Sequence, residues 1–151
     1  SALIELERRA QLANLRNLNL RLLRPDQPPP GGPFDGILID APCSGTGTWG
    51  RNPDARWRTS LETVTRMAAT QRTLLQRALP HLKPGGILVF STCSVATPEG
   101  QPVVDNFLQA NQSCRSSEFS TPLLTYPLPG ATTIWPDTGP GIGMFVARII
   151  K

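Results

Sequence analysis

The stretch FDGILIDAPCSGTG, Phe34–Gly47, contains the apolar run Gly36–Ile39, which ends at an acid, Asp40. A short apolar run between loop residues is typical of a buried strand. The preceding QPPPGGP, Gln27–Pro33, predicts a loop, because proline and glycine interrupt regular structure. We therefore expect a strand that ends at Asp40 and a loop behind it that carries Cys43.

A second apolar run, ILVFST, Ile87–Thr92, predicts another buried strand. Between the two runs, Thr59 and Glu62 have the spacing of a capping box, which marks the start of a helix. Leu82–Gly86 is expected to end that helix. Its apolar side would consist of Leu61, Val64, Met67, Leu74, Leu75, Ala78 and Leu79. The strand–helix–strand order predicts two adjacent, parallel strands.

The rest of the chain extends this pattern. Thr97–Pro98 is expected to open a further helix, with Val103, Val104, Phe107 and Leu108 as its apolar face. Met144–Lys151 predicts a final strand, which we expect to be antiparallel. At the other end, Ala2–Asn19 favours a helix by composition, and Leu20–Asp26 a short strand. The whole predicts an α/β fold: a mostly parallel sheet with helices on both faces.

The composition sets limits on the class of protein. The 151 residues suit one domain, residues 1–151, and the net charge of +4 fits an anionic partner, although many soluble domains are as basic. We expect no membrane helix and no secretory segment. Three cysteines and one histidine lack the paired spacing of a zinc site, so no metal is expected. The odd cysteine count favours reduced thiols in a cytoplasmic protein.

Two of the cysteines occupy equivalent places. Cys43 and Cys93 each follow a predicted strand, and each is flanked by small hydroxyl residues. Ligands of such sheets bind beyond the carboxyl ends of the strands, so both thiols are expected to face one crevice. A free cysteine is more often inert packing, which is what we expect of Cys114. The pairing makes that interpretation weaker for the other two.

One class of reaction uses a thiolate on a pyrimidine. Carbon 5 of cytosine is a poor nucleophile, but addition of a thiolate at carbon 6 raises its electron density and lets it attack a methyl group. One cysteine would attack, and a second group would assist the release. An acid near the ring nitrogen would stabilise the charge during addition, and Asp40 is placed for that role.

Two segments carry a resemblance to a known family. FDGILIDAPCSGTGTWGRNPDARWR and LKPGGILVFSTCSVATPE resemble the RNA cytosine-5 methyltransferases that use S-adenosyl-L-methionine, most of all the bacterial branch that modifies small-subunit ribosomal RNA. The resemblance implies a Rossmann-like class I methyltransferase sheet. It also implies methyl transfer to carbon 5 of a cytosine in RNA, ribosomal rather than transfer RNA, through a covalent cysteine–cytosine intermediate.

The resemblance also implies roles for individual residues. Cys93 matches the family's nucleophile, and Cys43 matches the cysteine that aids product release. Asp40 matches an acid near both cofactor and base, and Pro42 is carried over as cofactor-binding. Glu5 matches the acid that binds the cofactor ribose, and Asp26 matches an acid near the adenine. The alternatives are a solvated helix charge for Glu5 and a turn residue for Asp26.

The main departure from the family is an absence. The family's glycine-rich loop, which holds the methionine end of the cofactor, has no counterpart before Gly31. The chain therefore resembles the later part of a catalytic domain, truncated at its N-terminus so that the first strand and the glycine-rich loop are absent. We expect it to bind the cofactor weakly and to be inactive on its own. At the last strand, IGMF stands at 142–145 where the family usually has Asp-Gly-Phe-Phe, a change that we interpret as packing.

The loop Trp49–Arg58 is rich in arginine. Arg51 is expected to contact RNA phosphate, whereas Trp49 and Trp57 are expected to pack the loop onto the body of the domain. Two other classes of function stay open. One is an inactive RNA-binding or assembly module with the same fold. The other is a small-molecule methyltransferase, which leaves the paired cysteines unexplained.

Overall fold

The structure is a computed structural model that describes residues 2–24, 27, 29, 31–120, 127–136 and 141–151. The chain divides into two compact units, Ser1–Pro30 and Gly31–Lys151. Each unit is treated by itself below.

The first unit contains one helix, α1, Ala2–Leu12. The helix is shorter than the predicted Ala2–Asn19 because Asn14 adopts the left-handed conformation, with φ of 52°. The amides of Asn14 and Leu15 then donate back to the carbonyls of Gln11 and Ala10, which closes the helix. The strand expected at Leu20–Asp26 is absent over residues 20–24, and Asp26 lies outside the described residues.

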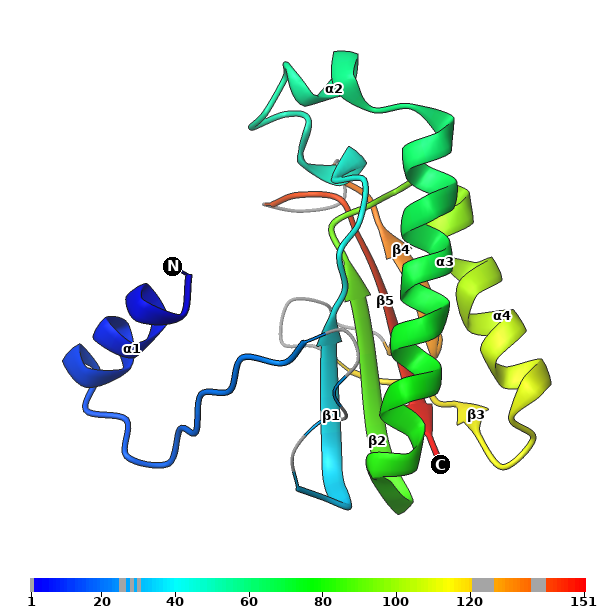
Figure 1. The fold of residues 1–151 in the computed structure, drawn as a ribbon. Helices are drawn as coiled ribbons and strands as arrows, with labels where there is room; N and C mark the ends of the chain where they lie inside the picture. Colours follow the sequence, from blue (N-terminus) through cyan, green and yellow to red (C-terminus); the bar gives the residue numbers. More distant parts are fainter. Residues whose placement is uncertain (1, 25–26, 28, 30, 121–126, 137–140) are drawn as a thin grey trace. The chain divides into compact units, whose positions relative to one another are not determined.

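The second unit is built on a mixed sheet (Figure 1). β1, Phe34–Asp40, pairs in parallel with β2, Leu82–Thr92. On its other side β2 pairs antiparallel with β5, Met144–Ile150. The strand order is β1-β2-β5-β3, and β4 also pairs with β5. The predicted neighbours and the predicted antiparallel last strand are therefore confirmed.

Two short strands were not expected. β3, Arg115–Ser116, and β4, Ala131–Ile134, both pair antiparallel with β5. Neither shows a long apolar run in the sequence, because each is short and only partly covered. β2 also begins five residues before the expected Ile87, at Leu82.

Two long helices cover one face of this sheet. α3, Leu61–Ala78, and α4, Gln101–Ala110, lie side by side over it in Figure 1. They share one buried core with alternate residues of β2 and β5, among them Leu88, Phe90, Phe145, Ala147 and Ile149. Each such large side chain contributes about 1.5–3 kcal/mol by leaving water. This core holds the carboxyl ends of β1 and β2 in register.

The burial of β1 differs from the prediction. Ile37 and Ile39 pack against the core, but Leu38 is 71% exposed on the opposite face. Within the described residues β1 is an edge strand of the sheet, and the two long helices of the second unit, α3 and α4, lie on one face only. The expectation of a fully buried strand is therefore wrong, and among the described residues of the second unit helices do not cover both faces of the sheet.

The starts of the helices also differ in detail. Ser60, not Thr59, caps α3, and its side chain accepts from the Thr63 amide. The segment after β2 first forms a 3-10 turn, η3, Thr97–Glu99, and α4 begins only after Gly100. The long loop after β1 contains a 3-10 turn, η1, Thr46–Thr48, and a short helix, α2, Ala55–Arg58.

Candidate active site

The two predicted thiols lie against each other. β1 and β2 are in parallel register, with Asp40 opposite Ser91, and the amide of Ala41 donates to the Ser91 carbonyl. The loops that follow therefore leave the sheet at the same edge. There the sulfurs of Cys43 and Cys93 are 2.9 Å apart, and both are free and half-buried. Cys114 packs separately in the core.

The proximity of the sulfurs affects their ionisation. Burial, together with the hydrogen bond to Cys93, raises the pKa of Cys43 to about 12. Two thiolates at this separation would repel strongly, so the pair keeps at least one proton near neutral pH. The pair can therefore offer one sulfur as a nucleophile and the other as a hydrogen-bond donor to it.

The two loops are joined along their backbones as well. The Gly47 amide donates to the Cys93 carbonyl, and the Gly143 amide donates to the Gly47 carbonyl at 2.9 Å. A Cβ added to Gly47 would lie 1.9 Å from the Gly143 carbonyl oxygen. Glycine is therefore required at 47, because only the absence of a side chain permits this approach.

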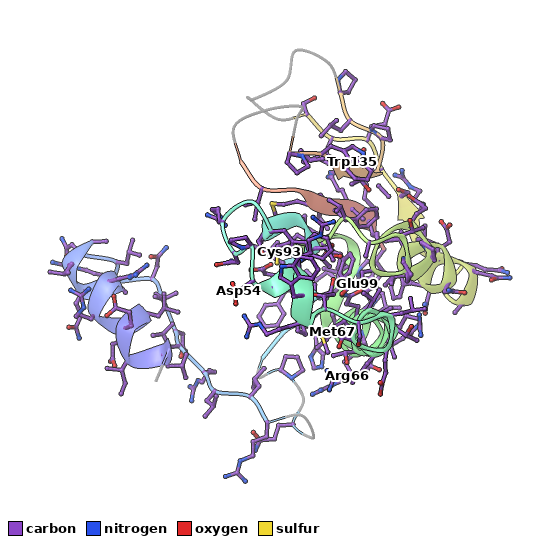
Figure 2. The ribbon with its side chains drawn as sticks, turned by 90° about the horizontal axis from the view of Figure 1, so that it is seen from above. Asp54, Arg66, Met67, Cys93, Glu99 and Trp135 are labelled. Atoms are coloured by element: carbon purple, nitrogen blue, oxygen red, sulfur yellow. The ribbon has the colours of Figure 1, made fainter. Side chains whose placement is uncertain are left out.

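A buried acid connects the loops beneath the sulfurs. Glu99, in η3, is 0% exposed. Its Oε1 accepts from the Ser44 amide at 2.8 Å and from Gln71 Nε2 at 3.0 Å. Its Oε2 accepts from Ser94 Oγ at 2.7 Å and also from Ser44 Oγ. Figure 2, which looks down on the carboxyl ends of β1 and β2, labels Glu99 close to Cys93.

Two further hydroxyl contacts complete this network. Thr46 Oγ1 lies 3.0 Å from Ser94 Oγ and accepts from the Val95 amide. The small hydroxyl residues that flank the cysteines are thus the groups that join the two loops. Sequence reasoning gave Glu99 no role. Its only signal was an acid in the turn just after the second cysteine.

The predicted cofactor and base ligands divide into three groups. Asp40 and Pro42, three residues and one residue before Cys43, are exposed, and the Asp40 carboxylate makes no hydrogen bond or ion pair with the described part of the chain. Pro42 turns its carbonyl inward, where it accepts from Gln71 Nε2 at 3.0 Å. Asp26 lies outside the described residues. Glu5 belongs to the other unit and is not placed relative to the thiols.

Glu5 is bound within its own helix. Its carboxylate accepts from Arg8 at 2.8 and 2.9 Å and from Arg9 at 2.8 Å. These arginines lower the pKa of Glu5 to about 2. Its part in ribose binding stays a prediction.

The arginine-rich loop is exposed. Trp57 is 85% exposed, so the expectation that it packs the loop onto the body is wrong. It sits on the short helix α2, which has no buried residue. Trp49 is half-buried, with its indole nitrogen enclosed. The Arg56 guanidinium lies 5.7 Å from the centre of the Trp57 ring and 6.0 Å from that of Trp49. Arg51 is exposed.

Comparison with known proteins identifies the family. The family model for 16S rRNA methyltransferase RsmB/F matches residues 2–150. The chain belongs to this family. Ribosomal RNA small subunit methyltransferase B is 40% identical over 118 residues in Salmonella arizonae and 38% identical in Erwinia tasmaniensis, with 78% of this chain and 26% of each relative covered. The chain thus spans about a quarter of the length of these relatives.

Solved structures of similar proteins agree with the fold. NSun6 from Pyrococcus horikoshii, solved with SFG, superposes with a TM-score of 0.82 at 25% identity, over 99% of this chain and 38% of that one. PH0851 superposes with a TM-score of 0.71 at 35% identity, over 78% of this chain and 26% of that one. The fold is therefore that of a Rossmann-like methyltransferase sheet.

Two absences hold for the described residues. No helix among them is long and apolar enough to cross a membrane. No group of three or more His, Cys, Asp or Glu side chains in that part of the chain could hold a metal ion.

Proposed function

We propose that this chain carries the catalytic thiols of an RNA cytosine-5 methyltransferase that acts on ribosomal RNA. The observation that carries the proposal is the pair Cys43–Cys93, 2.9 Å apart at the carboxyl ends of two adjacent parallel strands. Membership of a 16S rRNA methyltransferase family supports the substrate class. Ribosomal RNA and reduced thiols are both found in the cytoplasm, where we place the reaction.

Cys93 is proposed as the nucleophile. Its sulfur forms a bond to carbon 6 of cytosine, which makes carbon 5 reactive toward a methyl group. After methylation the carbon 5 proton passes to solvent water, and its electron pair re-forms the double bond between carbons 5 and 6. The bond between carbon 6 and sulfur breaks at the same time, and its electrons return to Cys93 as a thiolate. Cys43, whose raised pKa keeps it protonated, donates a hydrogen bond from its S–H to the departing Cys93 thiolate and so stabilises it. The attack at Cys93 rests on the family resemblance, because the two sulfurs are placed almost equivalently.

S-adenosyl-L-methionine is proposed as the methyl donor. When bound, it supplies the methyl group that carbon 5 receives. The relative NSun6 was solved with SFG, an analogue of this cofactor. Asp40 fits such a ligand, because it is exposed at the end of β1, three residues before Cys43, and its carboxylate has no partner among the described residues. Pro42 contributes an exposed ring next to it. For the base, Asp40 is proposed to act in its carboxylic acid form: it donates a proton to the cytosine ring nitrogen and so neutralises the negative charge that thiolate addition places on the ring. Glu5 and Asp26 stay proposals for the ribose and the adenine.

The RNA strand is proposed to run across the loop 49–58. Arg51 would contact a phosphate, and the exposed Trp57 ring would stack on an unpaired base. Arg56, which already lies against both tryptophan rings, would add its positive charge to the same surface.

The proposal is tested by identifying the product. The full protein is incubated with unmodified 16S ribosomal RNA and S-adenosyl-L-methionine, and the nucleosides are analysed by mass spectrometry. We expect 5-methylcytidine from the native protein and a loss of at least tenfold in rate for Asp40→Asn, which removes the acid near the ring. A methylated nucleoside other than 5-methylcytidine would contradict the proposal. Full activity of Asp40→Asn would remove Asp40 from it.

A further inference from the structure

Glu99 is a buried acid that the proposed chemistry does not use. It is 0% exposed, and its four hydrogen-bond donors among the described residues are all neutral groups. Burial of a carboxylate is costly even when it is hydrogen-bonded, and a cluster in which Glu99 and its side-chain partners were all apolar would avoid that cost. Stability alone therefore does not explain an acid at this position.

The donors come from both cysteine loops. Ser44, which follows Cys43, donates its amide and its hydroxyl, and Ser94, which follows Cys93, donates its hydroxyl. Gln71 binds Glu99 and the carbonyl of Pro42, the residue before Cys43. One carboxylate thus fixes a neighbour of each cysteine, and through Gln71 it fixes the other neighbour of Cys43.

We infer that Glu99 is the positioning residue that holds the two thiols face to face. The contribution of this positioning to catalysis rests on the proposed function. The chemistry requires a carboxylate. Its oxygens only accept, whereas an amide would turn an NH₂ group toward donors. Gln71 cannot compensate by turning over, because its NH₂ group already faces two acceptors, Glu99 and the Pro42 carbonyl.

A thiol-pairing equilibrium tests the positioning without reference to methyl transfer. In glutathione buffers, one glutathione disulfide oxidises Cys43 and Cys93 to one disulfide and is itself reduced to two thiols. The equilibrium constant measures the effective concentration of one thiol at the other. In the full protein with Cys114→Ala, we expect Glu99→Gln to lower this constant about tenfold, because freed loops hold the sulfurs together less often.

Two matched controls separate positioning from general effects. Asp105→Asn removes a carboxylate from α4, where Asp105 is exposed and bonded only to Gln101 among the described residues. Leu82→Ala weakens the core at the far end of β2, where Leu82 is 1% exposed. Both should leave the constant unchanged. An unchanged constant in Glu99→Gln, or an equal fall in Leu82→Ala, would overturn the inference.

A second set of variants keeps the test decisive if Glu99→Gln does not fold. Ser44→Ala and Ser94→Ala each remove one hydroxyl donor, and each should lower the constant by a smaller factor. Constants equal to that of the native protein in both would overturn the inference.

The catalytic contribution of Glu99 is measured from covalent adducts with RNA that contains 5-fluorocytosine. If the native protein forms no adduct, the proposed function fails while the thiol constants still decide the role of Glu99. If it does, Glu99→Gln should form adduct more slowly at saturating RNA, and an unchanged rate would overturn the catalytic role.

Discussion

The connection between β1 and α3 has two different parts. Its first part, residues 43–48, contacts the loop after β2 that carries Cys93, and its second part, residues 49–58, is largely exposed. Residues 43–48 bond to the second cysteine loop through Ser44, Thr46 and Gly47. Residues 49–58 make contacts among themselves, such as the exposed pair of Arg58 and Asp54 at 2.5 Å. Surface pairs of this kind contribute little to stability. The first part is held in place by hydrogen bonds to the second cysteine loop, whereas the second part is largely exposed and is the part that we propose contacts RNA.

The largest effect is expected at Cys93. Cys93→Ala should abolish methylation and leave no covalent protein–RNA adduct, because nothing then adds to carbon 6 of the base. The measurement is transfer of labelled methyl groups, together with a denaturing gel for the adduct. Methylation that persists in this variant would place the nucleophile elsewhere.

Cys43→Ala should produce the opposite result on the same gel. Cys93 still attacks, but its sulfur loses the hydrogen bond that supports its departure, so the adduct should accumulate and turnover should fall. A double variant, Cys43→Ala with Cys93→Ala, serves as the control and should show no adduct. If Cys93→Ala traps RNA and Cys43→Ala does not, the two roles are exchanged.

Two glycines, one in each part of the connection, test whether the first part is packed more tightly than the second. Gly47→Ala should destabilise the protein by about 3 kcal/mol, the upper end for overpacking, because the new Cβ meets backbone of residue 143. Gly50→Ala, three residues later, is the matched control. A Cβ at Gly50 meets nothing within 4 Å, so its effect should stay within about 0.5 kcal/mol. Denaturant unfolding measures both, and equal losses would show that the two parts of the connection do not differ.

The sequence predicted the central fold because apolar runs and strand-end cysteines are local signals. It predicted β1, β2, β5 and the proximity of Cys43 to Cys93, and it placed flanking hydroxyls without assigning their contacts. It failed where the answer depended on what covers a surface, as at Leu38 and Trp57. Glu99 was missed for a related reason: its donors come from residues 5 to 55 positions away, and no spacing rule connects them.

The smallest effects are expected in the exposed part of the connection, and they differ in kind. Arg51→Ala should weaken RNA binding and reduce the slope of log affinity against log salt by about 0.7–1, since one phosphate contact is lost. Trp57→Ala should weaken binding by about 1 kcal/mol, the low end for one stacked base, and leave the slope unchanged, since stacking releases no counterion. Arg72→Ala, an exposed arginine on α3, is the control and should change neither quantity. None of the three should alter stability, because these side chains are exposed.

Filter binding of 16S ribosomal RNA over a series of salt concentrations measures affinity and slope together. A fall in slope for Trp57→Ala would mean that the ring supports a neighbouring arginine such as Arg56 instead of a base.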